Sequence, residues 1–355
     1  MRYIGKYLKE LFMKNKKETL AIILMLIILG VFVFTACEDP CDHVWDITAA
    51  TCERRQECQL CGTKSKLGPH AYGEWQDVVS ISGEPEKQTK VCSICGDVVT
   101  QYIPTPNLGF TLINNNREYS ASMGNASSII IVIPEEYEGK PVTAIALEGF
   151  FNISITKVYI PDSVTTINSK AFQNCTSLTD IVFVNNSKLT TIGDRVFDGC
   201  SNLTSISIPD SVINIGEYAF RNCESLTNVE IPNKITTISE GLFTLCDNLA
   251  SITLPNSITN IGVSAFHDCT NLTTVIIPNG VTSIGVNAFK GCINLDISIP
   301  ISVNTIGSGA FHGWGGGQKI KIPYSRLNGV PSGWTGWRDN CGAVILNNSG
   351  VQVFP

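Results

Sequence analysis

The chain has 355 residues, of which 43% are hydrophobic and 16% are charged, and its formal net charge is -6. The apolar fraction excludes a wholly disordered chain, and the length allows one large domain or two to three small ones. The acidic balance excludes a general nucleic-acid-binding protein, because such a protein needs a surplus of Lys and Arg to neutralise phosphates.

Residues 1–36 have the composition of an export signal. Residues 1–20 are basic, and residues 21–36 (AIILMLIILGVFVFTA) are continuously apolar and uncharged. In a helix the apolar run spans about 24 Å, which is short of the roughly 30 Å hydrocarbon core of a bilayer. The pattern therefore favours a signal peptide over a permanent membrane span. The alternative is an uncleaved N-terminal anchor helix.

The residues that follow sharpen this prediction. Phe34-Thr35-Ala36-Cys37 resembles a bacterial lipobox, in which the sulfur of the Cys carries diacylglycerol. The resemblance implies that Cys37 is lipidated and that the rest of the chain is anchored in the bacterial cell envelope and exposed at the cell surface. Without residues 1–36, the chain keeps 19 basic and 29 acidic residues, a net charge of -10.

Residues 37–100 hold six further cysteines and two histidines with the spacing of metal ligands. Two segments, Cys58 to Gly62 and Cys92 to Gly96, are C-x2-C-G knuckles, in which two thiolates grip one ion. The predicted ligands are enough for two tetrahedral, structural zinc sites: Cys41, His43, Cys52, Cys58, Cys61, His70, Cys92 and Cys95. The segment resembles the short Cys/His repeats in front of some bacterial surface proteins, and we describe it as zinc-ribbon-like.

The same side chains admit other arrangements. One division of two ions is Cys52, Cys58, Cys61 and His70 on the first, with Cys41, His43, Cys92 and Cys95 on the second. A single ribbon of Cys58, Cys61, Cys92 and Cys95 competes with it. Three disulfides are the alternative to metal, because a small exported domain buries little core without cross-links.

Residues 130–323 repeat with a period of about 23 residues. Phenylalanine recurs eight times, at positions 150, 172, 197, 220, 243, 266, 289 and 311. A cysteine follows three residues after six of them, giving Cys175, Cys200, Cys223, Cys246, Cys269 and Cys292. The shared unit is L-t-x-I-x-I-P-x-s-V-t-x-I-g-x-x-A-F-x-x-C. The segment between Phe172 and Phe197 departs from it, because it lacks the Pro and carries Val184-Asn185-Asn186-Ser187 as an insertion.

This unit predicts one coil of a solenoid. The period lies within the leucine-rich range of 20–29 residues. The L-x-x-I-x-I piece alternates as a strand with one buried face, and the Pro ends it. The V-t-x-I-g piece reads as a second short strand, and A-F-x-x-C as one turn of helix. The predicted fold class is therefore mainly β with short helical turns, a solenoid of about eight coils that stack to form a core.

The six repeat cysteines occupy one position in each coil. Free Cys is among the most buried residue types and packs as a small hydrophobe. No His recurs at a fixed position beside them, which argues against metal or redox chemistry. We therefore expect a structural ladder of thiols in the core.

The repeat unit closely resembles the BspA-like leucine-rich repeats of bacterial surface proteins. The lead-in from Val132 to Val142 is similar to that family's first repeat, and the segment from Lys321 to Trp337 is similar to its closing cap. We accordingly divide the chain into a lipoprotein signal peptide (1–36), a Cys/His module (37–100), a linker and N-terminal cap (101–129), the repeats (130–323) and a C-terminal cap (324–355).

The resemblance implies a cell-surface protein that binds proteins or glycans, in some members an adhesin for host matrix proteins. The residues indicate where such binding would occur, because the strand side chains that miss the core line one small, polar face: Ser205, Ser207, Asn228, Glu230, Ser251, Thr253, Thr274 and Ile276. This face lacks the clustered Tyr, Trp and Arg that mark binding hot spots. The alternative is a structural envelope protein without a dedicated ligand.

The sequence lacks three common catalytic or nucleotide-binding motifs, and an enzyme with a site hidden in the solenoid is the least favoured of the three hypotheses. G-x-S-x-G, H-E-x-x-H and phosphate-loop patterns are absent, and the run Gly315-Gly316-Gly317 lacks the G-K-[ST] ending of a phosphate loop. Outside the Cys/His module the histidines are His267 and His312, each directly after a repeat Phe. We therefore predict that the protein is not an enzyme and binds no nucleic acid.

Overall fold

The computed structural model describes residues 74, 76–78, 85–91, 98–184, 187–324, 330–347 and 349–354. The chain forms two compact units. The first comprises Met1–Ile81 with Glu86–Tyr102, and the second comprises Ser82–Pro85 with Ile103–Pro355.

The described part of the first unit is a small antiparallel sheet. Its strands are β1 (Gln76–Val78), β2 (Lys87–Val91) and β3 (Val98–Tyr102), with β2 in the centre. Gln88 donates a side-chain hydrogen bond to Asp77 across β1 and β2 at 2.9 Å, and the Lys87 ammonium lies 4.9 Å from the centre of the Tyr102 ring.

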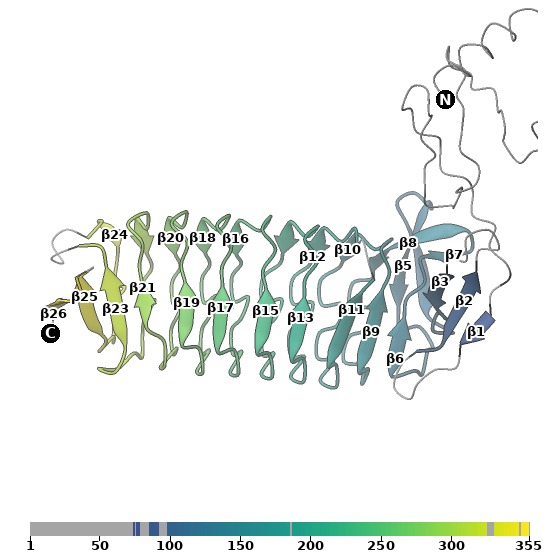
Figure 1. The fold of residues 1–355 in the computed structure, drawn as a ribbon, viewed down its shortest axis with the longest axis horizontal. Helices are drawn as coiled ribbons and strands as arrows, with labels where there is room; N and C mark the ends of the chain where they lie inside the picture. The colour runs from purple at the N-terminus through teal and green to yellow at the C-terminus, as the bar shows by residue number, and fades with distance from the viewer. Residues whose placement is uncertain are drawn as a thin grey trace, which may run out of the picture. The chain divides into compact units, whose positions relative to one another are not determined.

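The second unit is a β-solenoid in which each coil contributes two short strands (Figure 1). The first strand row contains ten strands: β6 (Ile130–Val132), β9 (Lys157–Ile160), β11 (Asp180–Phe183), β13 (Ser205–Ser207), β15 (Asn228–Glu230), β17 (Ser251–Thr253), β19 (Thr274–Ile276), β21 (Ile297–Ser298), β23 (Lys319–Ile322) and β25 (Val344–Asn347). Paired neighbours in this row are parallel and in register, so that Ser205 pairs with Asn228 and Ser251 with Thr274.

The second strand row lies on another side of the coils. It contains β8 (Lys140–Ile145), β10 (Thr166–Ile167), β12 (Thr191–Ile192), β14 (Asn214–Ile215), β16 (Thr237–Ile238), β18 (Asn260–Ile261), β20 (Ser283–Ile284), β22 (Thr305–Ile306) and β24 (Gly333–Trp334). The hairpin of β4 (Gly109–Ile113) and β5 (Glu118–Ser122) extends this row beyond β8, and β7 (Glu136–Tyr137) pairs with β8. At the other end, β26 (Gln352–Phe354) pairs antiparallel with β25.

The third side of each coil consists of hydrogen-bonded turns in place of the predicted helical turn. The residues two before and two after each repeat Phe have positive φ, as Lys170 (58°) and Asn174 (60°) do around Phe172. A helix needs negative φ throughout and bonds its N–H groups within its own coil. Here the Phe172 N–H instead donates to the Val196 carbonyl of the next coil at 3.0 Å. Lys170 and Asn174 donate to the same neighbouring coil.

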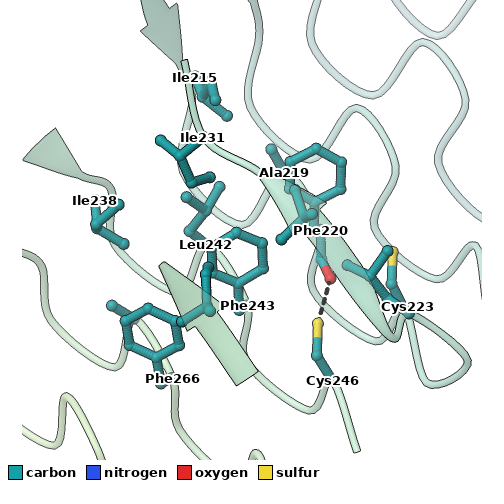
Figure 2. Packing of buried hydrophobic residues seen from close by; sticks show 14 of the residues in the cluster. Ile215, Ala219, Phe220, Cys223, Ile231, Ile238, Leu242, Phe243, Cys246 and Phe266 are labelled. Carbon is teal, nitrogen blue, oxygen red and sulfur yellow. Dashed lines mark hydrogen bonds between the residues drawn. The ribbon is translucent and has the colours of Figure 1, made fainter. Parts of the chain in front are cut away.

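A column of stacked phenylalanine rings runs through the core. Phe150, Phe172, Phe197, Phe220, Phe243, Phe266, Phe289 and Phe311 are all fully buried. Successive ring centres are 5.2 to 6.0 Å apart, and the rings are within 19° of parallel. Figure 2 shows Phe220, Phe243 and Phe266 in consecutive coils, packed beside Ala219 and Leu242. Stacking of coils therefore buries what no single coil could bury.

The structure confirms the predicted mainly β leucine-rich-repeat solenoid. It has ten strands in the first row where the sequence predicts about eight coils, because β23 and β25 continue the row past the last repeat Phe. The described residues include no helix, and so none that is long and apolar enough to cross a membrane.

Candidate functional site

The predicted binding residues lie on the outer surface of the first strand row. In β13, β15, β17 and β19 the first and third residues are exposed and the middle residue is buried. All eight predicted side chains are therefore exposed: Ser205, Ser207, Asn228, Glu230, Ser251, Thr253, Thr274 and Ile276. We call this surface the strand face.

The strand face is regular and nearly uncharged. Its side chains stand opposite one another across paired strands, as Ser207 does with Glu230 and Thr253 does with Ile276. Glu230 is the single carboxylate among the eight, and Ile276, which is 63% exposed, is the single large apolar side chain. Hydroxyl and amide groups in such a ladder can donate and accept hydrogen bonds to a partner's polar groups.

The strand face extends further than the sequence analysis expects. β23 repeats the alternation of exposed and buried residues, so Lys319 and Lys321 are exposed on the same row. The Lys319 N–H donates to the Asp296 carboxylate at 2.7 Å, which links β23 to the coil of β21. The K-I-K-I pattern of residues 319–322 carries the same period of two and could have indicated these lysines. The face therefore becomes charged towards its C-terminal end.

A charged cluster on the turn side escaped the sequence analysis. Asp198 is 1% exposed, and it accepts hydrogen bonds from Arg221 at 2.8 Å and from Gln173 at 2.9 Å. The Arg195 guanidinium lies 4.9 Å from the centre of the Tyr218 ring. The sequence does carry a signal for this cluster, because each of its residues has a fixed place relative to a repeat Phe. Gln173, Asp198 and Arg221 directly follow a repeat Phe, and Arg195 and Tyr218 stand two residues before one. A buried carboxylate that is paired in this way joins three coils.

Tyr218 also links its coil to the next one. Its hydroxyl donates to the Glu240 carboxylate, and this hydrogen bond, followed by burial, raises the pKa of Tyr218. The ring lies where a Cβ at position 241 would be, so Gly241, which has a φ of 59°, is required there. The cluster thus has a visible role in holding coils together.

The six repeat thiols are fully buried and hydrogen-bonded. Each Sγ donates to the carbonyl oxygen of the repeat Phe in the preceding coil, over 2.9 to 3.2 Å. Figure 2 shows this bond between Cys246 and Phe220, at 3.1 Å. Burial raises the pKa of Cys175 to about 11 and of Cys269 to about 12, and it raises the pKa of the other four thiols well above 9.0.

The burial and hydrogen bonding of the six repeat thiols favour a structural role over a nucleophilic one. A thiol is nucleophilic only as the thiolate, and these thiols stay protonated at neutral pH because the core disfavours charge. The thiol is a second donor to the Phe carbonyl, which also accepts the N–H of the Cys in its own coil, as Phe220 does from Cys223. A Val or Ala at the same position would supply no second donor. Cys341, half-buried near the C-terminus, likewise has its pKa raised by burial.

The two repeat histidines lie on the turn side of the last coils. His267 Nε2 is 3.6 Å from the Asp268 carboxylate, and burial is the main cause that lowers the pKa of His267. His312 Nε2 is 3.0 Å from the side-chain nitrogen of Asn340. Both therefore contact groups of the solenoid itself.

The predicted lipidation and zinc residues lie outside the described residues. These are Cys37, Cys41, His43, Cys52, Cys58, Cys61, His70, Cys92 and Cys95. Within the described part of the chain, no group of three or more His, Cys, Asp or Glu side chains is arranged to hold a metal ion. Lipidation and zinc binding remain predictions.

The fold and its 23-residue register define a leucine-rich-repeat protein with an exposed strand face. Residues 143–273 and 190–315 match the family model described as BspA type leucine rich repeat region, in six copies. The repeats of residues 143–315 are therefore of the BspA type. The matched model describes a repeat region and indicates no catalytic family.

One solved structure shows the same type of fold, and two others are reported with it as similar chains. A leucine-rich repeat protein from Bacteroides ovatus ATCC 8483 is 24% identical with a TM-score of 0.50, over 69% of this chain and 70% of that one. The T. pallidum leucine rich repeat protein is 26% identical with a TM-score of 0.43, over 60% and 89%. The pneumococcal vaccine antigen PcpA is 19% identical with a TM-score of 0.42, over 69% and 87%. A search of curated proteins found no match.

Proposed function

We propose that this chain is a lipid-anchored protein of the bacterial cell surface whose solenoid binds proteins or glycans through its strand face. Host matrix proteins, and surface proteins or glycans of host or neighbouring cells, are the proposed partners, and adhesion is the proposed role. The observation that carries the proposal is the strand face itself, in which all eight predicted side chains are exposed and in register.

The dimensions of the strand face suit such a role. From β13 to β23, where exposed and buried residues alternate, six parallel strands at about 4.8 Å spacing make a surface roughly 24 Å long. A standard protein interface covers about 800 Å² on each partner, so a partner of this face would also contact the loops that flank the strands. The acidic balance of the chain favours partners with basic patches, and binding to them should weaken as salt increases.

The predicted location and cofactor belong to the same proposal. An acylated Cys37 would hold the chain at the membrane while the solenoid faces outward. Zinc in the Cys/His module would be structural, because all eight predicted ligands are used in ligation and no coordination position stays open for substrate. We also propose that the chain is not an enzyme, which a panel of hydrolase substrates can test.

A substitution confined to the strand face tests the proposal. The chain is screened against immobilised matrix proteins and a glycan array, and the partner found is then measured with the triple variant Asn228→Arg, Ser251→Arg and Thr274→Arg. We expect its affinity to fall by at least about tenfold, because three long side chains stand where the partner would lie.

The matched control places arginines on the other strand row. Asn214→Arg, Thr237→Arg and Asn260→Arg alter exposed residues that also begin a strand, so this variant should bind as the unaltered chain does. Equal binding by both folded variants would move the site away from the strand face. A chain that captures nothing in the screen, yet is needed for envelope integrity, would instead indicate a structural envelope protein.

A further inference from the structure

One coil of the solenoid is longer than its neighbours. Phe172 and Phe197 are 25 residues apart, whereas Phe197 and Phe220 are 23 apart. β11 in this coil has four residues where β13 has three, and Val184 stands where the next coil has Pro209. β11 pairs with β9 and β13 pairs with β15, and the pairing along this row is interrupted between β11 and β13, as it is after β15 and after β19.

The long coil leaves part of its core uncovered. Ile181 and Phe183 are in register with Val158 and Ile160 of the preceding coil, both of which are fully buried. Ile181 and Phe183 nevertheless are only half-buried, although they pack against the core. Burying apolar surface stabilises a fold by about 25 cal/mol for each Å². The exposed apolar surface of Ile181 and Phe183 would therefore gain free energy if a partner covered it.

A hollow of about 500 Å³ lies beside these residues, between β11 and β13. One wall is apolar and consists of Ile181, Val182 and Phe183. The opposite wall is polar and includes Ser207, Asp210 and Ser211. Concave sites with an apolar lining and a few polar groups are the usual form of ligand pockets.

The polar wall indicates the charge of the occupant. Asp210 is exposed, and among the described residues no ion pair or hydrogen bond engages its carboxylate. The nearby cation Lys188 is 3.7 Å from Asp162 and so is paired elsewhere. The Ser211 hydroxyl already donates to the Ser187 carbonyl at 2.9 Å. Asp210 is therefore the group in this wall that is free to receive a cation.

We propose that this hollow anchors the protein partner of the strand face, and that it takes two adjacent side chains of a partner segment, one apolar and one basic. The apolar side chain would cover Ile181 and Phe183, and the basic side chain would pair with Asp210. Charge-assisted hydrogen bonds of this kind are stronger than neutral ones. This inference rests on the proposed binding function and assigns to it a site and a partner chemistry.

A matched pair of short peptides tests the occupant. The probes are acetylated and amidated Ser-Gly-Leu-Arg-Gly-Ser and Ser-Gly-Leu-Glu-Gly-Ser, added to the whole chain with its Ile and Val methyl groups labelled for NMR. We expect the Arg peptide to shift the methyl signals of Ile181 and Val182, with an affinity at least about tenfold above that of the Glu peptide. Equal shifts from both peptides, or no shift from either, would overturn the proposal.

Two variants of the hollow and two controls locate the binding. Val182→Arg should abolish binding of the Arg peptide, since it places a long cationic side chain in the lining of the hollow. Asp210→Asn should remove the preference for Arg over Glu. The controls Thr237→Arg and Glu224→Gln alter exposed residues that lie outside both the strand face and the lining of the hollow. Both controls should bind normally, and Val182→Arg that still binds while folded would refute the site.

The test is separate from that of the strand face. The triple variant Asn228→Arg, Ser251→Arg and Thr274→Arg leaves every residue that lines the hollow unaltered. If the triple variant loses the screened partner while Val182→Arg and Asp210→Asn retain it, the strand face stands and the anchoring pocket is wrong. Shifts at Ile181 from a methyl glycoside and not from the Arg peptide would also contradict a peptide occupant.

Discussion

The indole of Trp314 donates a hydrogen bond from Nε1 to the carbonyl oxygen of Phe289 at 2.8 Å. Trp314 stands three residues after Phe311, at the position that a cysteine occupies in the six preceding coils. The last Phe coil therefore satisfies the same buried carbonyl with an indole in place of a thiol. Trp314 and Trp337 both meet the Phe311 ring edge-on, with ring centres 5.0 and 6.0 Å away, and together they pack against the last ring of the phenylalanine column.

Two substitutions of Trp314 separate its two contributions. Trp314→Phe keeps a ring but removes the indole donor, and we expect the free energy of unfolding to fall by about 0.5–1.5 kcal/mol, because the Phe289 carbonyl still accepts the Cys292 N–H. Trp314→Cys restores the thiol donor but uncovers Phe311, and a loss of about 3–5 kcal/mol is expected, as for other large-to-small core changes. Thermal unfolding followed by circular dichroism measures both. A Trp314→Cys chain as stable as the unaltered one would show that the ring does not close the core.

The thiol ladder should make the solenoid sensitive to alkali. Its folded-state pKa values lie above the ordinary value of 9.0, so the fold favours the protonated thiol. This contribution is fully present below about pH 9 and is lost as pH rises towards about 12 for Cys269. Each thiol that ionises only in the unfolded chain lowers the free energy of unfolding by about 1.4 kcal/mol per pH unit.

The comparison that isolates one thiol is Cys269→Ala. Denaturant unfolding between pH 8 and pH 10.5 should show a shallower decline for this variant, by the contribution of a single thiol, even though it is less stable at neutral pH. Identical pH slopes for the two chains would mean that Cys269 is not held protonated by the fold.

Acylation of Cys37 should place the chain in the membrane fraction. The warrant is the basic and apolar segment that ends in Phe34-Thr35-Ala36-Cys37, and stable anchoring needs more than one acyl chain. Cells fed a palmitate analogue should label the unaltered chain and the control Cys341→Ala, whereas Cys37→Ala should take no label. An unlabelled wild-type chain, or a labelled Cys37→Ala chain, would contradict lipidation.

The Cys/His module should bind about two zinc ions, four ligands to each ion. Metal analysis of the purified chain checks the content, and the double variant Cys58→Ser and Cys61→Ser should lose at least one ion. Cys269→Ala, which alters the buried ladder, should lose none. Because the metal takes the place of a core in so small a segment, a chelator should unfold the Cys/His module. It should leave the unfolding temperature of the solenoid unchanged. Less than one ion per chain, with oxidised thiols, would favour disulfides.

The sequence by itself determined the solenoid, its register and the residues of its core. Apolar side chains recur with a period of two inside each strand and with a period of about 23 residues between coils. Both periods are visible when the repeat segments of the sequence are aligned. The exposed positions of the strand face follow from the same alternation, as Ser251, Ile252 and Thr253 show with their exposed, buried and exposed side chains.

Only the tertiary structure decided which hydrogen bonds and packing contacts join neighbouring coils. The Phe172 N–H reaches the Val196 carbonyl 24 residues later, and that bond replaces the helical turn which local sequence favours. The partner of the Cys246 thiol is the Phe220 carbonyl of another coil. The half-burial of Ile181 and Phe183 depends on where the neighbouring coil lies. These features arise from hydrogen bonds and packing between distant segments, so no pattern within a single repeat unit contains them.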